Sequence, residues 1–66
     1  MTRFEKEYKI IQKDPYEARE ILEKRQIEIN MVRQRQRLTR NRFVWECATQ
    51  ELEQLEKEYR MLDSLI

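Results

Sequence analysis

Apolar residues in the last third of the chain recur with alternating steps of three and four positions. This is the a and d pattern of a heptad repeat, continued over three heptads, and the side chains around it are mostly charged. The spacing predicts a helix over residues 42–65 whose apolar stripe packs against another helix. The residues of this heptad stripe are Trp45, Ala48, Leu52, Leu55, Tyr59, Leu62 and Ile66.

A second apolar stripe at helical spacing lies in the first half of the chain. Residues three, four and seven positions apart share one face of an α-helix, so this segment is also predicted to form an amphipathic helix. The stripe consists of Ala18, Ile21, Leu22, Ile29 and Val32, and we expect Ile27 and Met31 to widen it.

Two helix starts are visible in the sequence. Thr2 followed by Glu5 has the spacing of a capping box and predicts a short helix from about Arg3 to Lys13. Asp14 is a good N-cap, Pro15 suits the first helical turn, and Glu17 has the spacing of a second box. Proline disfavours helix at the residue before it, so the chain is predicted to bend there and to start a helix over residues 15–38.

The segment between the two stripes, residues 34–42, decides the architecture. Its only apolar residue is Leu38, and Thr39 and Asn41 are candidate caps for a new helix. If the chain turns here, the stripes pack antiparallel in a helical hairpin. If it does not, a single helix of roughly 50 residues forms a coiled coil between chains. Both forms are all-α and make residues 1–66 one helical interaction domain.

The composition narrows the chemistry. The chain has no glycine, one proline and 41% charged residues, which disfavours sheets and phosphate-binding loops. It has no histidine, and its single cysteine excludes an internal disulfide. We therefore expect no metal site, no cofactor, no small-molecule ligand and no enzymatic activity. Cys47, with Glu46 beside it, is expected to be an inert and partly buried thiol.

A chain of 66 residues is near the lower size limit for independent folding. Because disulfides and metals are not expected, a protein partner or a homodimer is the predicted source of additional stability. No apolar stretch approaches the roughly 20 residues that span a bilayer, and no signal peptide is visible. We expect an intracellular, cytoplasmic protein with no membrane partner.

Five arginines without any acidic residue give residues 29–45 a net charge of +5, whereas residues 46–66 carry −4. One interpretation is a helical dimer that binds nucleic acid, because guanidinium groups match phosphate oxygens. The other is a solvated surface or a set of ion pairs with the acidic segment. The candidate nucleic-acid-binding residues are Arg33, Arg35, Arg37, Arg40 and Arg42.

The preferred function is a non-enzymatic module for protein–protein interaction: an adaptor, an inhibitor or a minor subunit of a larger assembly. Large aromatic and aliphatic side chains carry most of the binding energy at protein interfaces. Within a hairpin, the stripe residues are expected to face residues 18–32, whereas two residues off the stripe are better candidates for outside contacts. The predicted interface consists of Trp45, Leu52, Leu55, Tyr59 and Leu62, with Phe43 and Met61 off the stripe.

The segment Thr49-Gln50-Glu51-Leu52-Glu53, followed by Leu55 and Tyr59, resembles the Ser-Gln-Glu-Leu-Asp signature of small helical-hairpin phosphatases that act on sporulation response regulators. The resemblance covers about a dozen residues. It implies a regulator of a phosphorylated response regulator, in which Thr49 and Glu53 occupy the positions of the family's serine and aspartate. Both residues differ from the family pattern, and the glycine of the family's inter-helix loop is absent.

Overall fold

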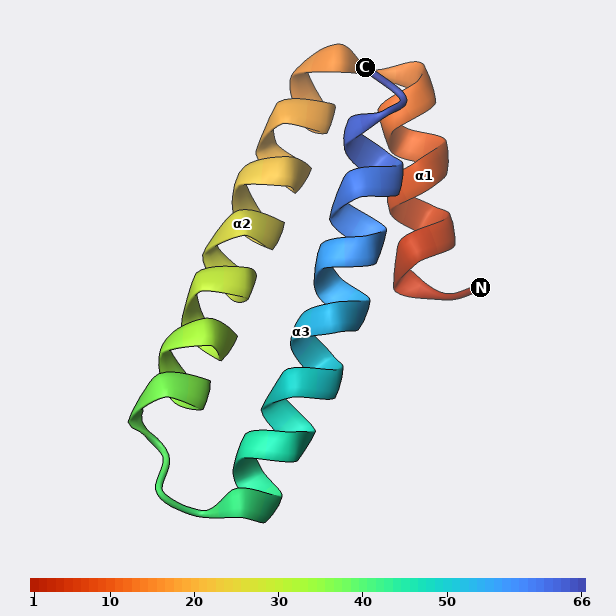
Figure 1. Cartoon of the computed structure of the whole chain (residues 1–66). Helices are drawn as coiled ribbons and strands as arrows, with labels where there is room; N and C mark the ends of the chain where they lie inside the picture. The colour runs from red at the N-terminus through yellow and green to blue at the C-terminus, as the bar shows by residue number, and fades with distance from the viewer.

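The computed structural model describes all 66 residues and contains three helices and no strand. Helix α1 spans Arg3–Lys13, α2 spans Pro15–Leu38 and α3 spans Arg42–Asp63. Helices α2 and α3 form an antiparallel hairpin, and α1 lies beside the end of the hairpin that is far from the turn (Figure 1). The prediction of a short helix followed by a hairpin is confirmed, and the alternative of one long helix is wrong.

Each helix begins at a side-chain cap that the sequence indicates. The Thr2 hydroxyl accepts a hydrogen bond from the backbone N–H of Glu5 at 3.2 Å. The Asp14 carboxylate accepts two, from the N–H groups of Tyr16 at 3.0 Å and Glu17 at 3.4 Å. These bonds satisfy donors that have no partner within the first turn of a helix. Local chemistry therefore sets where α1 and α2 start.

The hairpin turn consists of residues 39–41 and uses no residue with positive φ. Thr39 and Asn41 both have extended backbone angles, and the Thr39 hydroxyl accepts a hydrogen bond from the Asn41 N–H at 3.2 Å. The Asn41 side chain then caps α3 by accepting from the N–H groups of Phe43 at 2.9 Å and Val44 at 3.2 Å. Two polar caps in sequence thus reverse the chain without glycine.

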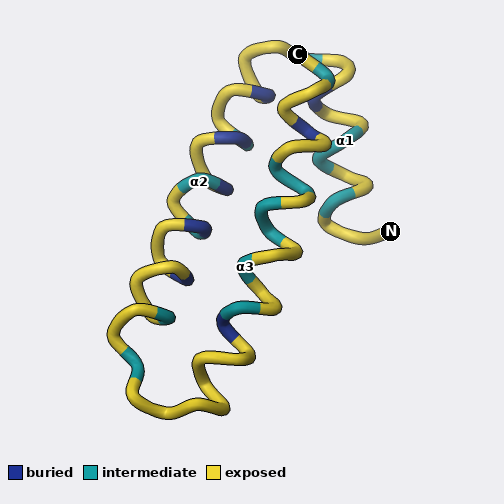
Figure 2. Tube along the Cα trace, in the orientation of Figure 1, coloured by how far each residue is buried: buried dark blue, intermediate teal, exposed yellow.

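The molecule is a rod of 42 × 20 × 17 Å, and its core is concentrated at one end. Buried residues line the side of α2 that faces α3 (Figure 2). The core cluster lies where α1 joins the hairpin and contains Ile11, Ala18, Leu22 and Leu62, with Phe4, Tyr8, Ile21, Tyr59 and Leu65 packed around it. We call α1 together with residues 15–28 of α2 and 55–63 of α3 the three-helix end. Residues 29–54 form the turn half, where only Ile29, Val32 and Ala48 are buried.

Several side chains lie elsewhere than the pattern predicts. Ile27 and Met31 do not widen the buried stripe: each is two positions from Ile29, about 200° around the helix, and both are exposed. Cys47 is exposed because it precedes the buried Ala48 by one position, which turns it away from α2. Ile66 lies past the end of α3 and is exposed.

None of the three helices combines the length and the apolar character needed to cross a membrane.

Candidate interaction surface

Most of the heptad stripe of α3 packs inside the chain. Leu62 is fully buried, and Leu52, Leu55 and Tyr59 are half-buried toward α2, as expected for the hairpin form. Leu62 and Tyr59 pack in the core cluster, and Leu62 has no surface left for another protein. Any partner must therefore use residues outside the centre of this stripe.

Trp45 begins the stripe but keeps 46% of its surface exposed. At its level α2 offers Gln36, which donates a hydrogen bond to the Thr49 hydroxyl at 2.6 Å instead of presenting an apolar side chain. The indole ring therefore remains partly open near the turn. Phe43 and Met61, which the pattern places off the stripe, are both exposed, and Phe43 is 73% exposed.

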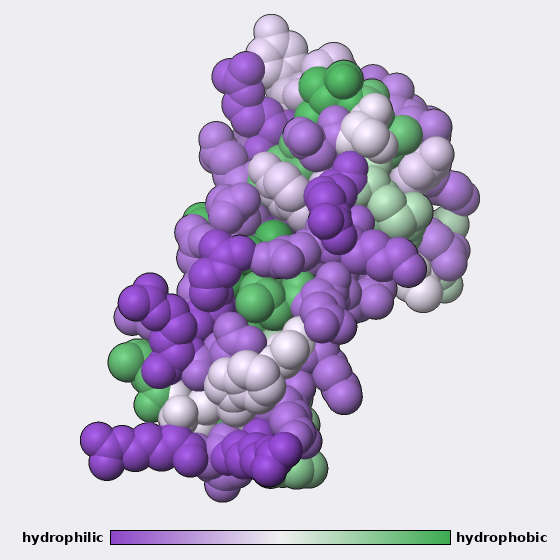
Figure 3. Space-filling view, in the orientation of Figure 1, coloured by the Kyte–Doolittle hydropathy of each residue, from purple (hydrophilic) through white to green (hydrophobic).

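The turn half displays large apolar side chains on several sides. Figure 3 shows hydrophobic and intermediate colours near the turn, among strongly hydrophilic side chains. Such side chains are the usual anchors of protein interfaces when they gather in one region. The exposed large hydrophobic residues of the turn half are Met31, Leu38, Phe43, Val44 and Trp45.

Three of the five central arginines form ion pairs within the chain. Arg33 contacts Glu56 at 2.5 Å and Arg35 contacts Glu51 at 3.5 Å, both across the hairpin. Arg42 contacts Glu46 at 3.3 Å within α3. The hairpin thus folds part of the basic segment back onto the acidic one. Arg37 and Arg40 have no ion pair, so they are the two of this group not engaged by a carboxylate.

A buried charge network at the three-helix end was not predicted from the sequence. Arg25 is only 1% exposed and binds Glu7 of α1 through two nitrogens, one of them at 2.7 Å. It also donates to Glu58 of α3 at 2.9 Å. One guanidinium therefore joins all three helices, in the forked geometry that arginine offers to carboxylates.

A second arginine extends this network to the surface. Arg3 donates two hydrogen bonds to Glu28, at 2.6 and 2.8 Å, and lies 3.6 Å from Glu7. The sequence does contain a signal for the network: Arg25 follows the buried Leu22 by three positions and precedes Ile29 by four. It therefore occupies a gap in the apolar stripe of α2, on its buried face.

The network shifts the pKa of two carboxylates downward. The hydrogen bond from Arg3 lowers the pKa of Glu28. Partial burial raises this pKa by a smaller amount, so the pKa lies below its ordinary value. Burial acts to raise the pKa of Glu58, but hydrogen bonds from Gln54 and Arg25 and the charges of Arg25 and Arg3 outweigh it. The pKa of Glu58 therefore lies below its ordinary value, and both groups favour the charged form in the folded state.

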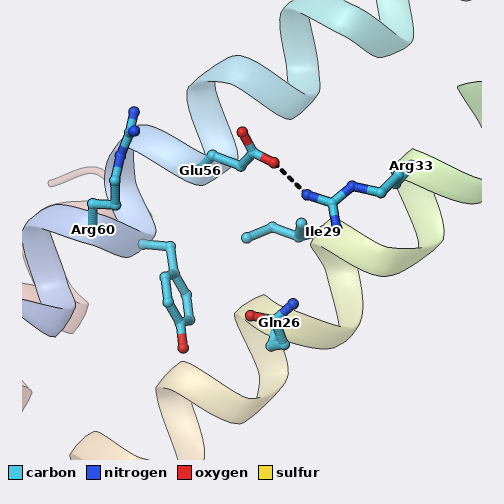
Figure 4. A pocket seen from close by; sticks show the side chains of 6 residues that line it. Gln26, Ile29, Arg33, Glu56 and Arg60 are labelled. Atoms are coloured by element: carbon cyan, nitrogen blue, oxygen red, sulfur yellow. Dashed lines mark hydrogen bonds and ion pairs between the residues drawn. The ribbon is translucent and has the colours of Figure 1, made fainter.

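An open hollow of about 250 Å³ lies between α2 and α3. Figure 4 shows Arg33 of α2 reaching across it to Glu56 of α3, with Ile29 and Gln26 on the α2 wall and Arg60 directed away from the pair. Of the two arginines that line the hollow, Arg33 is already paired with a carboxylate. The hollow thus acts as a solvated ion-pair site between the two helices.

The two residues at the phosphatase-signature positions lie one turn apart on α3. Thr49 is half-buried, and its hydroxyl is engaged twice: it donates to the Trp45 carbonyl at 2.8 Å and accepts from Gln36. Glu53 is exposed. In this arrangement the threonine hydroxyl has a structural role in holding α2 to α3.

Comparison of the chain with protein-family models, with curated proteins and with solved structures finds no match. The inference of function therefore rests on the residues and their geometry.

Proposed function

We propose that this chain is a small, non-enzymatic helical module for protein–protein interaction that docks through its turn half. The observation that carries the proposal is the exposure of Phe43 and Trp45 beside the turn. Aromatic side chains of this size are costly to leave in water, and they dominate binding energy when a partner covers them.

The separation of the core from the exposed apolar side chains supports the same function. The core cluster that holds the hairpin together lies at the three-helix end. The exposed apolar side chains of the turn half are therefore not needed for this core and are left for a partner. Leu38 is the last residue of α2 and Phe43 is the second residue of α3, so the short capped turn holds them in place relative to each other. Rigid presentation of apolar side chains lowers the entropic cost of binding.

The alternative of a nucleic-acid-binding dimer has less support. Phosphate binding needs several free cationic groups, because each neutralised phosphate adds to the affinity. Arg33 and Arg35 are held by carboxylates of α3, and Arg42 by Glu46. These acids would compete with phosphate for the same guanidinium groups.

Site-specific photocrosslinking in cells tests the proposal directly. A photoreactive phenylalanine analogue at position 43 is expected to give a discrete covalent adduct with a protein. The same analogue at position 57, an exposed site on the outer surface of α3, is the matched control and should give none. Absence of an adduct at position 43, or equal adducts at both positions, would contradict docking through the turn half.

A further inference from the structure

We infer that the end of the rod at the hairpin turn docks an acidic, partly apolar segment of another protein. The segment places carboxylates beside Arg37 and Arg40 and apolar side chains against Phe43. This inference rests on the proposed interaction function and deepens it by naming the chemistry of the partner. We call residues 37–45, which connect α2 to α3 in Figure 1, the turn end.

The turn end carries cationic groups that the chain itself does not neutralise. Arg37 and Arg40 form no ion pair, and the sequence has no acidic residue within four positions of either. Every basic residue outside residues 29–45 has an acidic residue within four positions. This includes Arg19 and Lys24, which also form no ion pair but each adjoin a glutamate in the sequence. Positive charge without a nearby acid is therefore a property of the turn end.

The start of α3 adds to this positive charge. Helices α1 and α2 have Glu5 and Glu17 in their first turns, whereas α3 has no acidic residue there and begins with Arg42. The N-terminus of a helix carries a partial positive charge, which an acidic side chain in the first turn offsets. Arg42 pairs only with Glu46, and its side chain is 92% exposed, so a second carboxylate can reach it.

Exposed apolar side chains lie within the same nine residues. Leu38 and Phe43, on the two sides of the turn, are each 73% exposed, and Val44 is 36% exposed. Consecutive Cα atoms are about 3.8 Å apart, so those of Phe43 and Arg40 lie within about 12 Å of each other. Figure 3 shows strongly hydrophilic side chains that project from this end, with hydrophobic colours beside them. One partner segment can therefore contact both kinds of group.

The mixture of cationic and apolar groups defines the chemistry of the partner. Interfaces pair opposite charges, and like charges across an interface suppress wrong partners. A basic or neutral surface would leave the arginines without counter-charges, whereas a purely acidic one would leave Leu38 and Phe43 in water. A protein segment in which acidic and apolar residues alternate satisfies both groups.

Two other anionic surfaces match the turn end less well. The phosphate backbone of a duplex offers anionic oxygens but no apolar surface to cover Leu38 and Phe43. An anionic bilayer can take apolar side chains, but basic clusters that bind its lipids contain about four to eight Lys and Arg residues. The turn end has three arginines, and Arg42 among them already pairs with Glu46.

Photocrosslinking from position 43, combined with charge reversal, tests the inference with the full chain. Arg37→Glu with Arg40→Glu should lower the yield of the protein adduct by roughly tenfold or more, because the partner's carboxylates then meet like charges. Arg37→Lys with Arg40→Lys keeps the positive charge and should retain most of the adduct. Arg19→Glu with Lys24→Glu makes the same charge change at two exposed residues of α2, and this matched control should leave the yield unchanged. Circular dichroism checks that each variant keeps its helix content.

Mass spectrometry of the crosslinked peptide identifies the partner segment. We expect an excess of acidic over basic residues around the point of attachment. If the adduct survives Arg37→Glu with Arg40→Glu, or if the segment has no acidic excess, the inference is wrong and the proposed function stands. An adduct with nucleic acid or lipid in place of protein, or no adduct at position 43, would overturn both.

Discussion

The three-helix end and the turn half of this rod differ in how far they bury their apolar residues. At the three-helix end, α1 covers the hairpin, the core cluster is buried, and Arg25 links Glu7 to Glu58 out of solvent. In the turn half, two helices pack with three buried apolar residues and leave Trp45 and Phe43 exposed. The surface-to-volume ratio of a two-helix segment explains the difference, since a third element is needed to enclose a core.

This contrast indicates where stability and binding reside. Substitutions at the three-helix end should affect folding, whereas those in the turn half should affect association. Matched pairs of residues, one from each region, can test that division.

The largest effect is expected at Arg25. Arg25→Met removes the group that compensates two largely buried carboxylates, and breaking such a pair costs about 3 to 5 kcal/mol of unfolding free energy. Arg33→Met changes a residue of the turn half and breaks its exposed pair with Glu56, which should cost less than about 1 kcal/mol. Urea denaturation followed by circular dichroism measures both, and equal losses would refute the contrast.

Leucine truncation should show the same asymmetry. Leu62→Ala creates a cavity at the fully buried centre of the core, and we expect a loss of about 2 to 5 kcal/mol. Leu38→Ala, at the exposed end of α2, should change stability by no more than about 0.5 kcal/mol. Thermal melts of the two variants suffice, and a strongly destabilised Leu38 variant would show that the turn half has a core of its own.

Acid should loosen the three-helix end. The folded-state pKa values of Glu28 and Glu58 are lowered, so their contribution to stability is complete above their unfolded pKa, about 4.3. It is lost as the pH falls through the lower folded values, because the unfolded chain binds the protons more readily. This loss of stability should be smaller than the loss caused by Arg25→Met, because Arg25 still pairs with Glu7 when Glu58 is protonated.

Denaturation curves between pH 7 and pH 2 measure this loss. Glu58→Gln should flatten the acid limb of the stability profile, and Glu53→Gln, on an exposed site of α3, serves as the control. An unchanged profile in Glu58→Gln would mean that this carboxylate does not contribute.

The smallest effect is expected at the turn. Asn41→Ala removes the side chain that accepts from the Phe43 and Val44 N–H groups, at a cost of about 1 kcal/mol. Asn41→Ser keeps a capping oxygen and should be close to wild type. Hydrogen exchange should localise the loss to the first turn of α3, and a loss spread over α1 would contradict a local role.

The periodicity of apolar residues does not predict the buried charge network around Arg25. Arginine is rarely fully buried, so Arg25 is not among the residues of the predicted α2 stripe, although its position lies on the same side of the helix. Only the approach of Glu7 and Glu58 from two other helices makes its burial favourable. Those partners are 18 and 33 positions away, and no local pattern in the chain connects them.

The exposure of Trp45 has a similar origin. Its place in the heptad stripe predicts contact with another helix, and the stripe itself is correct from Ala48 to Leu62. What faces it depends on the register between α2 and α3, which puts Gln36 at that level of the hairpin. The same register decides which of the central arginines reach the acids of α3.

The sequence by itself determined the three helices and their starts, because caps and propensities act between residues a few positions apart. The side chains of Thr2, Asp14 and Asn41 each accept from N–H groups that have no backbone partner within the first turn of their helix. Only the tertiary structure decided that the chain folds back at residues 39–41, that Arg25 is buried and that Ile27 and Met31 face outward. Those outcomes depend on contacts between distant segments, whose free energies are set by packing and desolvation and not by neighbours along the chain.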